Sequence, residues 1–233
     1  MRFTDPLISG VLLKRYKRFL ADFRLDNGQV ITVHCPNSGS MKTCKTPGWQ
    51  GLLSDSKNPK RKHRYTWEMI HNGRTWIGIN TNIPNRIAEE AIADGAIPEL
   101  RGYQNIRKEV KYGNNSRIDL LLENGEQKCY VEVKNVTLVE EDGFYKFPDA
   151  VTERGRKHLY ELLSMKKAGN RAVMLYVVQR NDGTIFKPAV DIDANYAQAL
   201  REAHRNGVEI LVYQAEVNPN IIYIKQAIQY SLD

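Results

Sequence analysis

The chain has 233 residues, of which 42% are hydrophobic and 26% are charged, so it can form one large domain or two small ones with a buried core. These proportions exclude a disordered protein, and three scattered cysteines exclude a disulfide scaffold. The longest apolar run, at 172–178, is too short to cross a membrane, and the first ten residues lack the apolar core of a signal peptide. We therefore expect a cytoplasmic protein with no membrane partner.

The net charge of +7 is distributed unevenly along the sequence. Residues 1–86 carry a net charge of +10, whereas residues 87–233 carry −3. Such an excess in one part of a chain predicts a polyanionic partner for that part, either nucleic acid or an anionic membrane surface. A solubilising surface explains the charge alone equally well.

Short strands are the dominant pattern of residues 1–83. The stretch 12–33 is strand-like, with a hairpin signal at Asn27-Gly28, and a loop rich in Pro, Gly, Ser and Asn follows. Two further strands are expected at 64–70 and 74–80. About five short strands in this length are typical of a small barrel of the oligonucleotide/oligosaccharide-binding (OB) type. We therefore assign residues 1–83 to a basic OB-like domain.

Two basic clusters lie in this domain, one in the first strand and one in a polar connection. Cations that follow phosphates, beside rings that stack on bases, are typical of barrels that bind single strands. One isolated charge run is more often a solvated surface, but two such clusters in one small basic domain favour nucleic-acid binding. The residues predicted to bind DNA here are Lys14, Arg15, Tyr16, Lys17, Arg18, Lys60, Arg61, Lys62 and Arg64.

From Pro84 onwards, helical and strand patterns alternate, which predicts a separate α/β domain over residues 84–233. Polar caps, glycines and prolines mark the ends of its elements. The expected elements are, in chain order, a helix capped by Asn85 and ended by Gly95, strands at 106–112, 117–122 and 128–135, a helix from Asp149 to Lys167, a strand at 172–178, a helix at 194–205 and a strand at 208–213.

The expected hairpin at 117–135 is the most informative segment. If Asn124-Gly125 is a two-residue turn, the numbers of paired residues sum to 249. Asp119 and Glu132 are then diagonal neighbours with Cβ atoms less than about 8 Å apart, so both carboxylates can reach one cation. The period of two places Asp119, Tyr130, Glu132 and Lys134 on one face, opposite an apolar face of Ile118, Leu120, Leu122, Cys129, Val131 and Val133.

Two carboxylates with a nearby peptide carbonyl, which we assign to Val133, suit Mg²⁺ or Mn²⁺ rather than zinc. Lys134 can position a water molecule or stabilise charge that develops on a phosphate. A surface hairpin with alternating Glu and Lys explains the bare pattern as well. The apolar opposite face and the flanking helices favour a site. The preceding helix offers Glu89 or Glu90 as an additional acid, and the following helix offers cations for phosphate: Arg154, Arg156, Lys157 and His158.

A helix, strands bearing SRIDLLL and YVEVKN, and a basic helix together resemble the PD-(D/E)xK nuclease-like fold, with Asp119, Glu132 and Lys134 at the motif positions. Ile118 stands where the motif name has proline. Arg156 and Tyr160 hold the spacing of the Gln-x-x-x-Tyr element that some nuclease relatives carry.

Distinctive motifs stand at six places in the chain: RYKRFLAD at 15–22, HCPNSGSM at 34–41, YTWE at 65–68, SRIDLLL at 116–122, VEVKNVTL at 131–138 and FPDAVTERGRKHLYEL at 147–162. Through these motifs, nearly the whole chain resembles the bacterial sugar fermentation stimulation protein A family. The resemblance implies an OB-type barrel joined to a nuclease-like domain. It also implies non-specific DNA binding, with a regulatory link to maltose and other sugar metabolism.

Three functions remain in view. The first is non-specific DNA binding, in which the nuclease-like domain and its metal site serve binding or regulation. The second is a nuclease, dependent on magnesium or manganese, that hydrolyses phosphodiester bonds in DNA or RNA. The third, less favoured, is a barrel that binds an acidic sugar or a protein. Intact motif residues leave catalysis open, because a fold alone does not establish activity.

Overall fold

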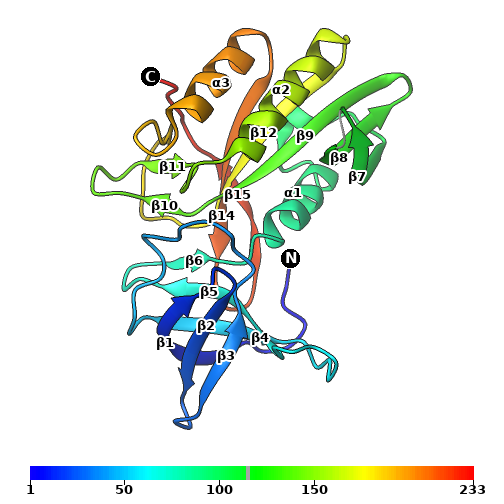
Figure 1. Cartoon of the computed structure of the whole chain (residues 1–233). Coiled ribbons are helices and arrows are strands. Elements are labelled where there is room, and N and C mark those ends of the chain that lie inside the picture. The colour runs from blue at the N-terminus through cyan, green and yellow to red at the C-terminus, as the bar shows by residue number, and fades with distance from the viewer. Residues whose placement is uncertain (114–115) are drawn as a thin grey trace.

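The chain folds into two lobes joined at a waist, and the computed structural model describes residues 1–113 and 116–233 (Figure 1). The N-terminal lobe is built from β-strands, and the C-terminal lobe is a β-sheet with helices on its faces. Among the described residues, no helix is both long and apolar enough to cross a membrane.

The sheet of the N-terminal lobe closes into a barrel. Its strands run in the spatial order β3-β2-β1-β4-β5-β6, and the pairing of His34 with Thr66 joins β3 to β5. The rings of Phe23 and Trp67 meet edge to face in the interior, with centroids 5.2 Å apart. The expected OB-type barrel is confirmed. Its strands are β1 (Ile8–Tyr16), β2 (Leu20–Leu25), β3 (Val30–His34), β4 (Gln50–Asp55), β5 (Tyr65–His71) and β6 (Trp76–Gly78).

The sequence pattern missed a turn and a strand of this barrel. The basic segment is not one strand, because β1 ends at Tyr16 and the chain turns through Lys17 and Arg18, with φ angles of 47° and 62°. Two successive residues at positive φ are typical of a tight hairpin turn. Strand β4 escaped detection because Gly51 resembles a loop residue, although the Phe23 ring packs where its Cβ would be.

The sheet of the C-terminal lobe lies between layers of helices. Strand β12 is parallel to both neighbours and buried on both faces, which explains its uninterrupted apolar sequence. Helix α1 (Ile83–Ala93) packs on one face of the sheet, and helices α2 (Glu153–Lys167) and α3 (Ala194–Arg205) pack on the other. In spatial order the strands are β15 (Ile222–Ala227), β14 (Glu209–Val217), β12 (Arg171–Val178), β9 (Gln127–Val136), β8 (Ser116–Asn124) and β7 (Asn105–Tyr112).

Several elements of this lobe were not expected. Strand β15 pairs antiparallel with the end of β14, so the strand expected at 208–213 extends to Val217 and is not the last. The other unexpected elements are too short to show a period in the sequence. They are the 3₁₀ turn at Pro98–Leu100 and the small sheet of β10 (Leu138–Val139), β11 (Tyr145–Phe147) and β13 (Phe186–Pro188).

Two predicted helix caps are wrong. The residue before α1 is Asn82, and Asn85 lies inside the first turn, because Pro84 is tolerated there. Thr152 caps α2 by accepting a hydrogen bond from the Gly155 N–H. Asp149 instead accepts a hydrogen bond from the Met41 N–H of the barrel, at 2.9 Å.

Polar contacts at the waist join the lobes. Besides Asp149, the buried Arg180 donates to the Thr137 carbonyl at 2.6 Å and to Thr43 of the barrel at 3.2 Å. The N-terminus also crosses the waist, because the Met1 ammonium donates to the Ile222 carbonyl at 2.8 Å. The first residues of the chain therefore pack on the C-terminal lobe.

We expect Gly39→Ala to loosen this joint, because a Cβ at Gly39 would overlap both carboxylate oxygens of Asp149. Overpacking of this kind destabilises proteins by about 1–3 kcal/mol. Urea unfolding measures the effect, and Ser38→Ala, at the exposed neighbouring position, is the control. Equal unfolding midpoints for the two variants would contradict the tight fit.

Candidate metal and nucleic-acid site

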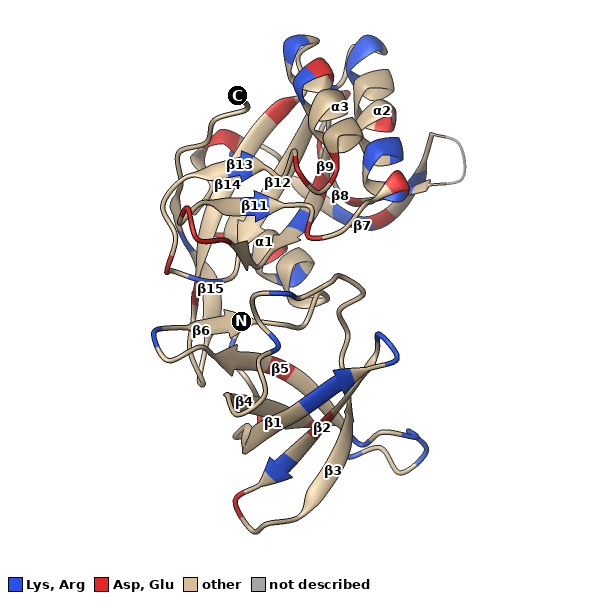
Figure 2. Cartoon of the chain, turned by 60° about the vertical axis from the view of Figure 1, so that its left-hand side comes forward, with Lys and Arg blue, Asp and Glu red and all other residues tan. Residues whose placement is uncertain are grey.

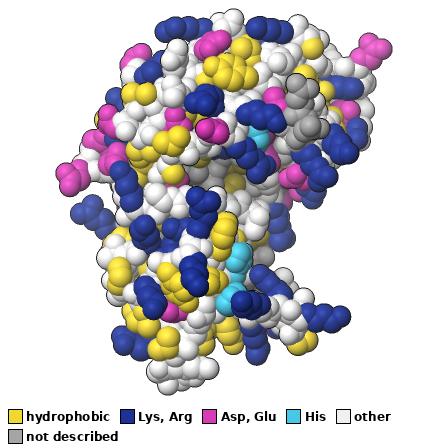
Figure 3. Space-filling view, in the orientation of Figure 1, with side chains coloured by type: hydrophobic (Ala, Val, Ile, Leu, Met, Phe, Trp, Pro, Cys, Tyr) yellow, Lys and Arg dark blue, Asp and Glu magenta, His cyan; other side chains and the backbone are white. Residues whose placement is uncertain are grey.

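A cleft of about 550 Å³ lies between the two lobes and contains the predicted carboxylates. From the C-terminal lobe it is lined by Asp119, Glu132 and Lys134, and from the barrel by the turn residue Arg18 and the loop 37–39. Lys and Arg side chains border the waist on both lobes (Figure 3). The cleft therefore brings carboxylates of one lobe together with a cation of the other.

The hairpin that carries the site has a different register from the one expected. Asn124 pairs with Gln127, so the turn residues are Gly125 and Glu126, and paired numbers sum to 251. A shift of two residues preserves the faces, because side chains alternate with a period of two. Continued along the hairpin, this register places Asp119 opposite Glu132 rather than diagonal to it.

The alternation of β8 is interrupted at Asp119. Leu120 and Leu122 pack on the side of α1, as expected, but Ile118 packs in the core beneath α2 and α3. The assignment of Ile118 to the same face as Leu120 is therefore wrong. Glu109 of β7, which the register places opposite Asp119, has a φ of 52°, so the two strands are irregular at this point.

Asp119 is largely buried, and each of its oxygens accepts one hydrogen bond. Its Oδ2 accepts from the Val133 N–H at 2.7 Å, and its Oδ1 accepts from the Asn85 side-chain amide at 2.8 Å. Burial and the neighbouring Glu132 carboxylate raise the pKa of Asp119 to about 6, against the opposing effect of Lys134. This carboxyl group is therefore costly to ionise unless a cation lies beside it.

Glu132 is only 1% exposed, and its two oxygens have different surroundings. Oε1 accepts from the Lys134 ammonium at 2.5 Å and lies against Nδ1 of His158. Oε2 has no hydrogen-bond partner among the described residues, although it is buried. Burial opposes ionisation, but Lys134 and His158 together hold the pKa of Glu132 below its usual value. The glutamate is thus a carboxylate with one oxygen left to bind a ligand.

These residues fit a hard divalent cation. A buried carboxylate oxygen with no hydrogen-bond donor carries an uncompensated desolvation free energy, and a bound metal ion would offset it. No group of three or more His, Cys, Asp or Glu residues in the described part of the chain could hold a metal. A cation here would therefore need oxygen ligands besides Asp119 and Glu132, such as the Val133 carbonyl and water.

The structure does not bring Glu89 or Glu90 to this cluster. Glu89 pairs with Lys108 at 2.9 Å, and Glu90 pairs with the Met1 ammonium and with Arg86. The residue of α1 that reaches the site is Asn85, one helical turn before Glu89. Sequence reasoning treated Asn85 as a cap and so overlooked its amide.

Some of the barrel residues predicted to bind DNA have other partners. The Arg15 guanidinium donates to the carbonyls of Arg18, Asn37 and Gly39, at 2.7, 2.7 and 3.0 Å, and so holds the cleft loop in place. The Tyr16 hydroxyl donates to Asp22 at 2.9 Å, and Lys14 pairs with the same carboxylate at 3.5 Å.

The remaining barrel cations are more accessible. Lys17 and Arg18 are exposed in the β1–β2 turn, and Arg18 faces the cleft. Figure 2 shows further cations in the loop between β4 and β5, where Lys60, Arg61 and Lys62 are exposed. The last of the predicted cations there, Arg64, pairs with Asp55 at 2.5 Å while remaining exposed.

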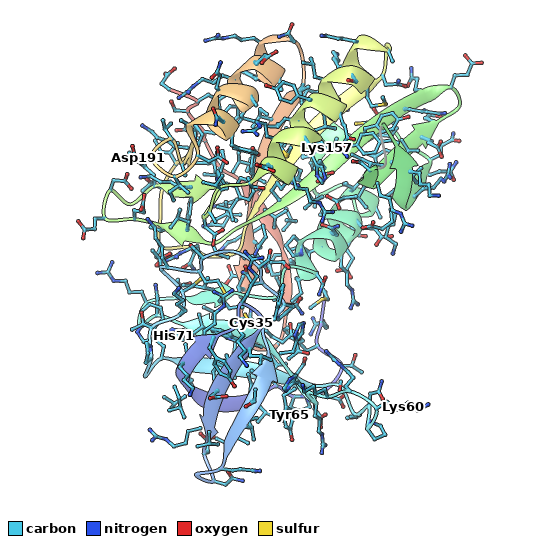
Figure 4. All side chains as sticks on the ribbon, viewed as in Figure 1. Cys35, Lys60, Tyr65, His71, Lys157 and Asp191 are labelled. Atoms are coloured by element: carbon cyan, nitrogen blue, oxygen red, sulfur yellow. The ribbon has the colours of Figure 1, made fainter. Side chains whose placement is uncertain are left out.

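Of the four side chains of α2 that were expected to bind phosphate, two line the cleft, and the pair at the Gln-x-x-x-Tyr spacing does not. Arg154 and His158 line the cleft, and the Arg154 Nε lies 3.4 Å from Nε2 of His158. Tyr160 is 44% exposed, and Arg156 does not line the cleft. Lys157 lies on α2, while Lys60 lies on the loop that projects from the barrel (Figure 4).

Comparison with known proteins identifies relatives along the whole chain. The family model of the sugar fermentation stimulation protein RE domain matches residues 82–221, and that of the SfsA N-terminal OB domain matches residues 13–79. A sugar fermentation stimulation protein homolog from Geotalea uraniireducens (strain Rf4) is 57% identical over 224 residues, which are 96% of each chain. The homolog from Maricaulis maris (strain MCS10) is 51% identical over 233 residues, covering 100% of this chain and 99% of its own.

A solved structure shares the fold. The structure of Pyrococcus furiosus SfsA in complex with Ca²⁺ has a TM-score of 0.89 to this chain and 26% sequence identity. The match covers 99% of this chain and 98% of the other.

Proposed function

This chain belongs to the sugar fermentation stimulation protein family, and we propose that it binds DNA without sequence specificity in the cleft between its lobes. One observation carries the proposal: cations from both lobes, Arg18 and Arg154, line the cleft that contains the Asp119 and Glu132 carboxylates. Cations of this kind contact phosphates rather than base edges, so they bind without reading sequence. The family name supports a link to sugar fermentation, and a regulatory role in sugar metabolism, including maltose metabolism, is part of the proposal.

A cytoplasmic location is part of the proposal. All three cysteines, Cys35, Cys44 and Cys129, lie in the described part of the chain and are buried and free. Burial raises the pKa of each thiol, to about 12 for Cys44 and Cys129, so none is an activated nucleophile. Free cysteines are usual in a reducing compartment.

The residues that would hold Mg²⁺ or Mn²⁺ are Asp119 and Glu132 through their carboxylates and Val133 through its carbonyl. The unpartnered Oε2 of Glu132 and the Ca²⁺ complex of the Pyrococcus furiosus relative support a hard divalent cation. Such an ion neutralises phosphate charge and lowers the pKa of a bound water. Without it, two neighbouring carboxylates would repel a DNA strand in the cleft.

A second function, phosphodiester hydrolysis, is favoured by the position of Lys134. Its ammonium lies 2.5 Å from Glu132 and lines the cleft, where it can stabilise charge on a phosphate or orient a water molecule. Arg154 lines the same cleft, where it would hold a phosphate of the same strand. Incubation with single- and double-stranded DNA and RNA, with and without Mg²⁺ or Mn²⁺, tests this function. Cleavage by Asp119→Ala at the rate of the parent would exclude this site.

The basic loop of the barrel gives a test of DNA binding itself. We expect the triple variant Lys60→Ala, Arg61→Ala, Lys62→Ala to bind DNA more weakly and with a shallower salt dependence. The slope of log affinity against log salt changes by about 0.7 to 0.9 for each phosphate that the variant no longer neutralises. Fluorescence anisotropy with a labelled oligonucleotide at several salt concentrations, with and without a divalent cation, measures both quantities.

The matched control removes the same charge elsewhere. Lys128, Lys167 and Arg205 are exposed on the C-terminal lobe, outside both the basic loop of the barrel and the cleft. Their triple alanine variant should keep the slope of the parent. Equal reductions of affinity in the two variants would show that net charge alone drives binding, and a salt-insensitive parent would exclude the proposed mode of binding.

A further inference from the structure

We infer that His158 is a positioning residue that determines which oxygen of Glu132 faces a bound cation, an inference that rests on the proposed metal site. His158 is 5% exposed on α2, and its Nδ1 lies against Oε1 of Glu132. The Lys134 ammonium reaches the same oxygen at 2.5 Å. Both groups therefore meet one oxygen of the carboxylate and leave the other free.

The hydrogen bonds of His158 define its tautomer. A guanidinium has only donors, so the contact of the Arg154 Nε at 3.4 Å favours Nε2 of His158 as an acceptor. The proton of the neutral ring is then on Nδ1, which donates it to the Glu132 carboxylate. The Lys134 ammonium also has only donors, so its contact with Nδ1 at 3.2 Å brings together two donors that share one acceptor.

Glu132 is thus oriented by two hydrogen-bond donors, Lys134 and His158, whose side chains differ in conformational freedom. A lysine side chain is long and flexible, and its ammonium could follow either carboxylate oxygen. An imidazole that is buried on a helix and hydrogen bonded through both nitrogens has no such freedom. The hydrogen bond from His158 therefore fixes the orientation of the Glu132 carboxylate, with Oε1 bound to the protein. Oε2 has no hydrogen-bond partner in the described structure and is left to bind a cation.

Helix α2 is itself anchored close to His158. Thr152 caps the helix, and its own N–H donates to Asp193 at 2.8 Å. Three residues earlier, Asp149 binds the barrel through the Met41 N–H. The imidazole is therefore positioned by contacts on both lobes, consistent with a site that needs both.

Amide replacements of His158 separate positioning from packing. Asparagine can place an amide N–H near the position of Nδ1, whereas glutamine places its amide near the position of Nε2. Loss of an outer-shell partner weakens metal binding by about 10- to 100-fold, and we expect this loss for His158→Ala and His158→Gln in calorimetric titrations of Mn²⁺ into the metal-free chain. We expect His158→Asn to stay within about threefold of the parent, because it keeps the donor.

Nitrogen-resolved NMR of the metal-free protein provides a readout that does not depend on the metal. We expect His158 to carry its proton on Nδ1 and to have a bare Nε2. A proton on Nε2 alone would overturn the inference. Thermal unfolding checks each variant, and if His158→Ala fails to fold, the comparison of the asparagine and glutamine variants decides.

The experiment separates two kinds of failure. If the parent binds no Mn²⁺, the proposed metal site is wrong, and the inference falls with it. If the parent binds Mn²⁺ and Asp119→Asn does not, but all three His158 variants bind like the parent, only the role of His158 is wrong.

Discussion

Replacing Asp119 by asparagine is expected to stabilise the metal-free protein while removing its affinity for divalent cations. Burial and the Glu132 carboxylate raise the pKa of Asp119 to about 6, so the carboxylate that forms by pH 7 lowers the stability of the folded chain. Asparagine occupies nearly the same volume without the charge. It cannot, however, supply the anionic oxygen that a hard cation requires.

The pH dependence of this stabilisation follows from proton linkage. Between the unfolded pKa of 3.8 and the folded pKa of about 6, folded Asp119 binds more protons than unfolded Asp119. The free energy of unfolding of the parent therefore falls as the pH rises through this window. The advantage of Asp119→Asn should be absent below about pH 4 and complete above about pH 6.

The size of the effect is bounded by the same pKa difference. A rise from 3.8 to about 6 corresponds to about 3 kcal/mol, and we expect about 1–2 kcal/mol because asparagine keeps only one acceptor for the Val133 and Asn85 donors. Urea unfolding in EDTA from pH 4 to pH 7 measures it. A variant less stable than the parent at pH 7 would contradict the raised pKa.

Metal affinity is the second measurement on the same variant. We expect Mn²⁺ binding to weaken by more than about 100-fold, the upper end of what loss of an outer-shell partner costs. Glu89→Gln is the control, because Glu89 is an acid of α1 that pairs with Lys108 away from the cleft. Unchanged affinity in Asp119→Asn, or an equal loss in Glu89→Gln, would place the metal elsewhere.

The local parts of this site are readable from the sequence. Side chains alternate along a strand, so Glu132 and Lys134 of β9 share a face whatever the register of the hairpin, and a register error of two residues leaves the facing of the two strands unchanged. An error of one residue would have reversed every face. The apolar run of β12 and the glycines that follow the helices are also local sequence signals. Strand β12 and helix α3 accordingly lie where they were expected.

What could not be predicted depends on contacts between distant segments. Asp149 has the sequence context of a helix cap, but its carboxylate accepts from Met41, 108 positions away. Arg15 has the sequence context of a phosphate ligand, but carbonyls of the loop after β3 use its donors. Asn85 and His158 reach Asp119 and Glu132 from opposite faces of the sheet, and no local pattern records that.

Loss of the Arg180 guanidinium is expected to destabilise the fold more than the added methyl group of Gly39→Ala does. Arg180 is 3% exposed, and its Nε and Nη2 form a fork to the two oxygens of Asp182 at 2.6 and 2.7 Å. Asn72 of the barrel donates to the same carboxylate at 2.6 Å. This group of residues therefore links the end of β12 to both the barrel and the loop after β9.

Arg180→Met fills the space but leaves Asp182 with an uncompensated charge. Removing one partner of a buried ion pair costs about 3–5 kcal/mol, and we expect the lower end, because the Asp182 side chain is 11% exposed. The double variant Arg180→Met, Asp182→Asn removes the orphaned charge and should recover part of the loss. Urea unfolding of the two single variants and the double variant measures the coupling.

The exposed pair of Arg64 and Asp55 is the matched control. It has the same forked geometry, with bonds of 2.8 and 2.5 Å, but the Arg64 side chain is 60% exposed. Solvent screens such a pair, so Arg64→Met should lower the free energy of unfolding far less than Arg180→Met does. Equal losses of stability in Arg64→Met and Arg180→Met would show that burial at the waist does not increase the contribution of the ion pair to the free energy of unfolding. A large loss confined to Arg180, with weaker DNA binding below the unfolding transition, would show that the cleft needs both lobes held in place.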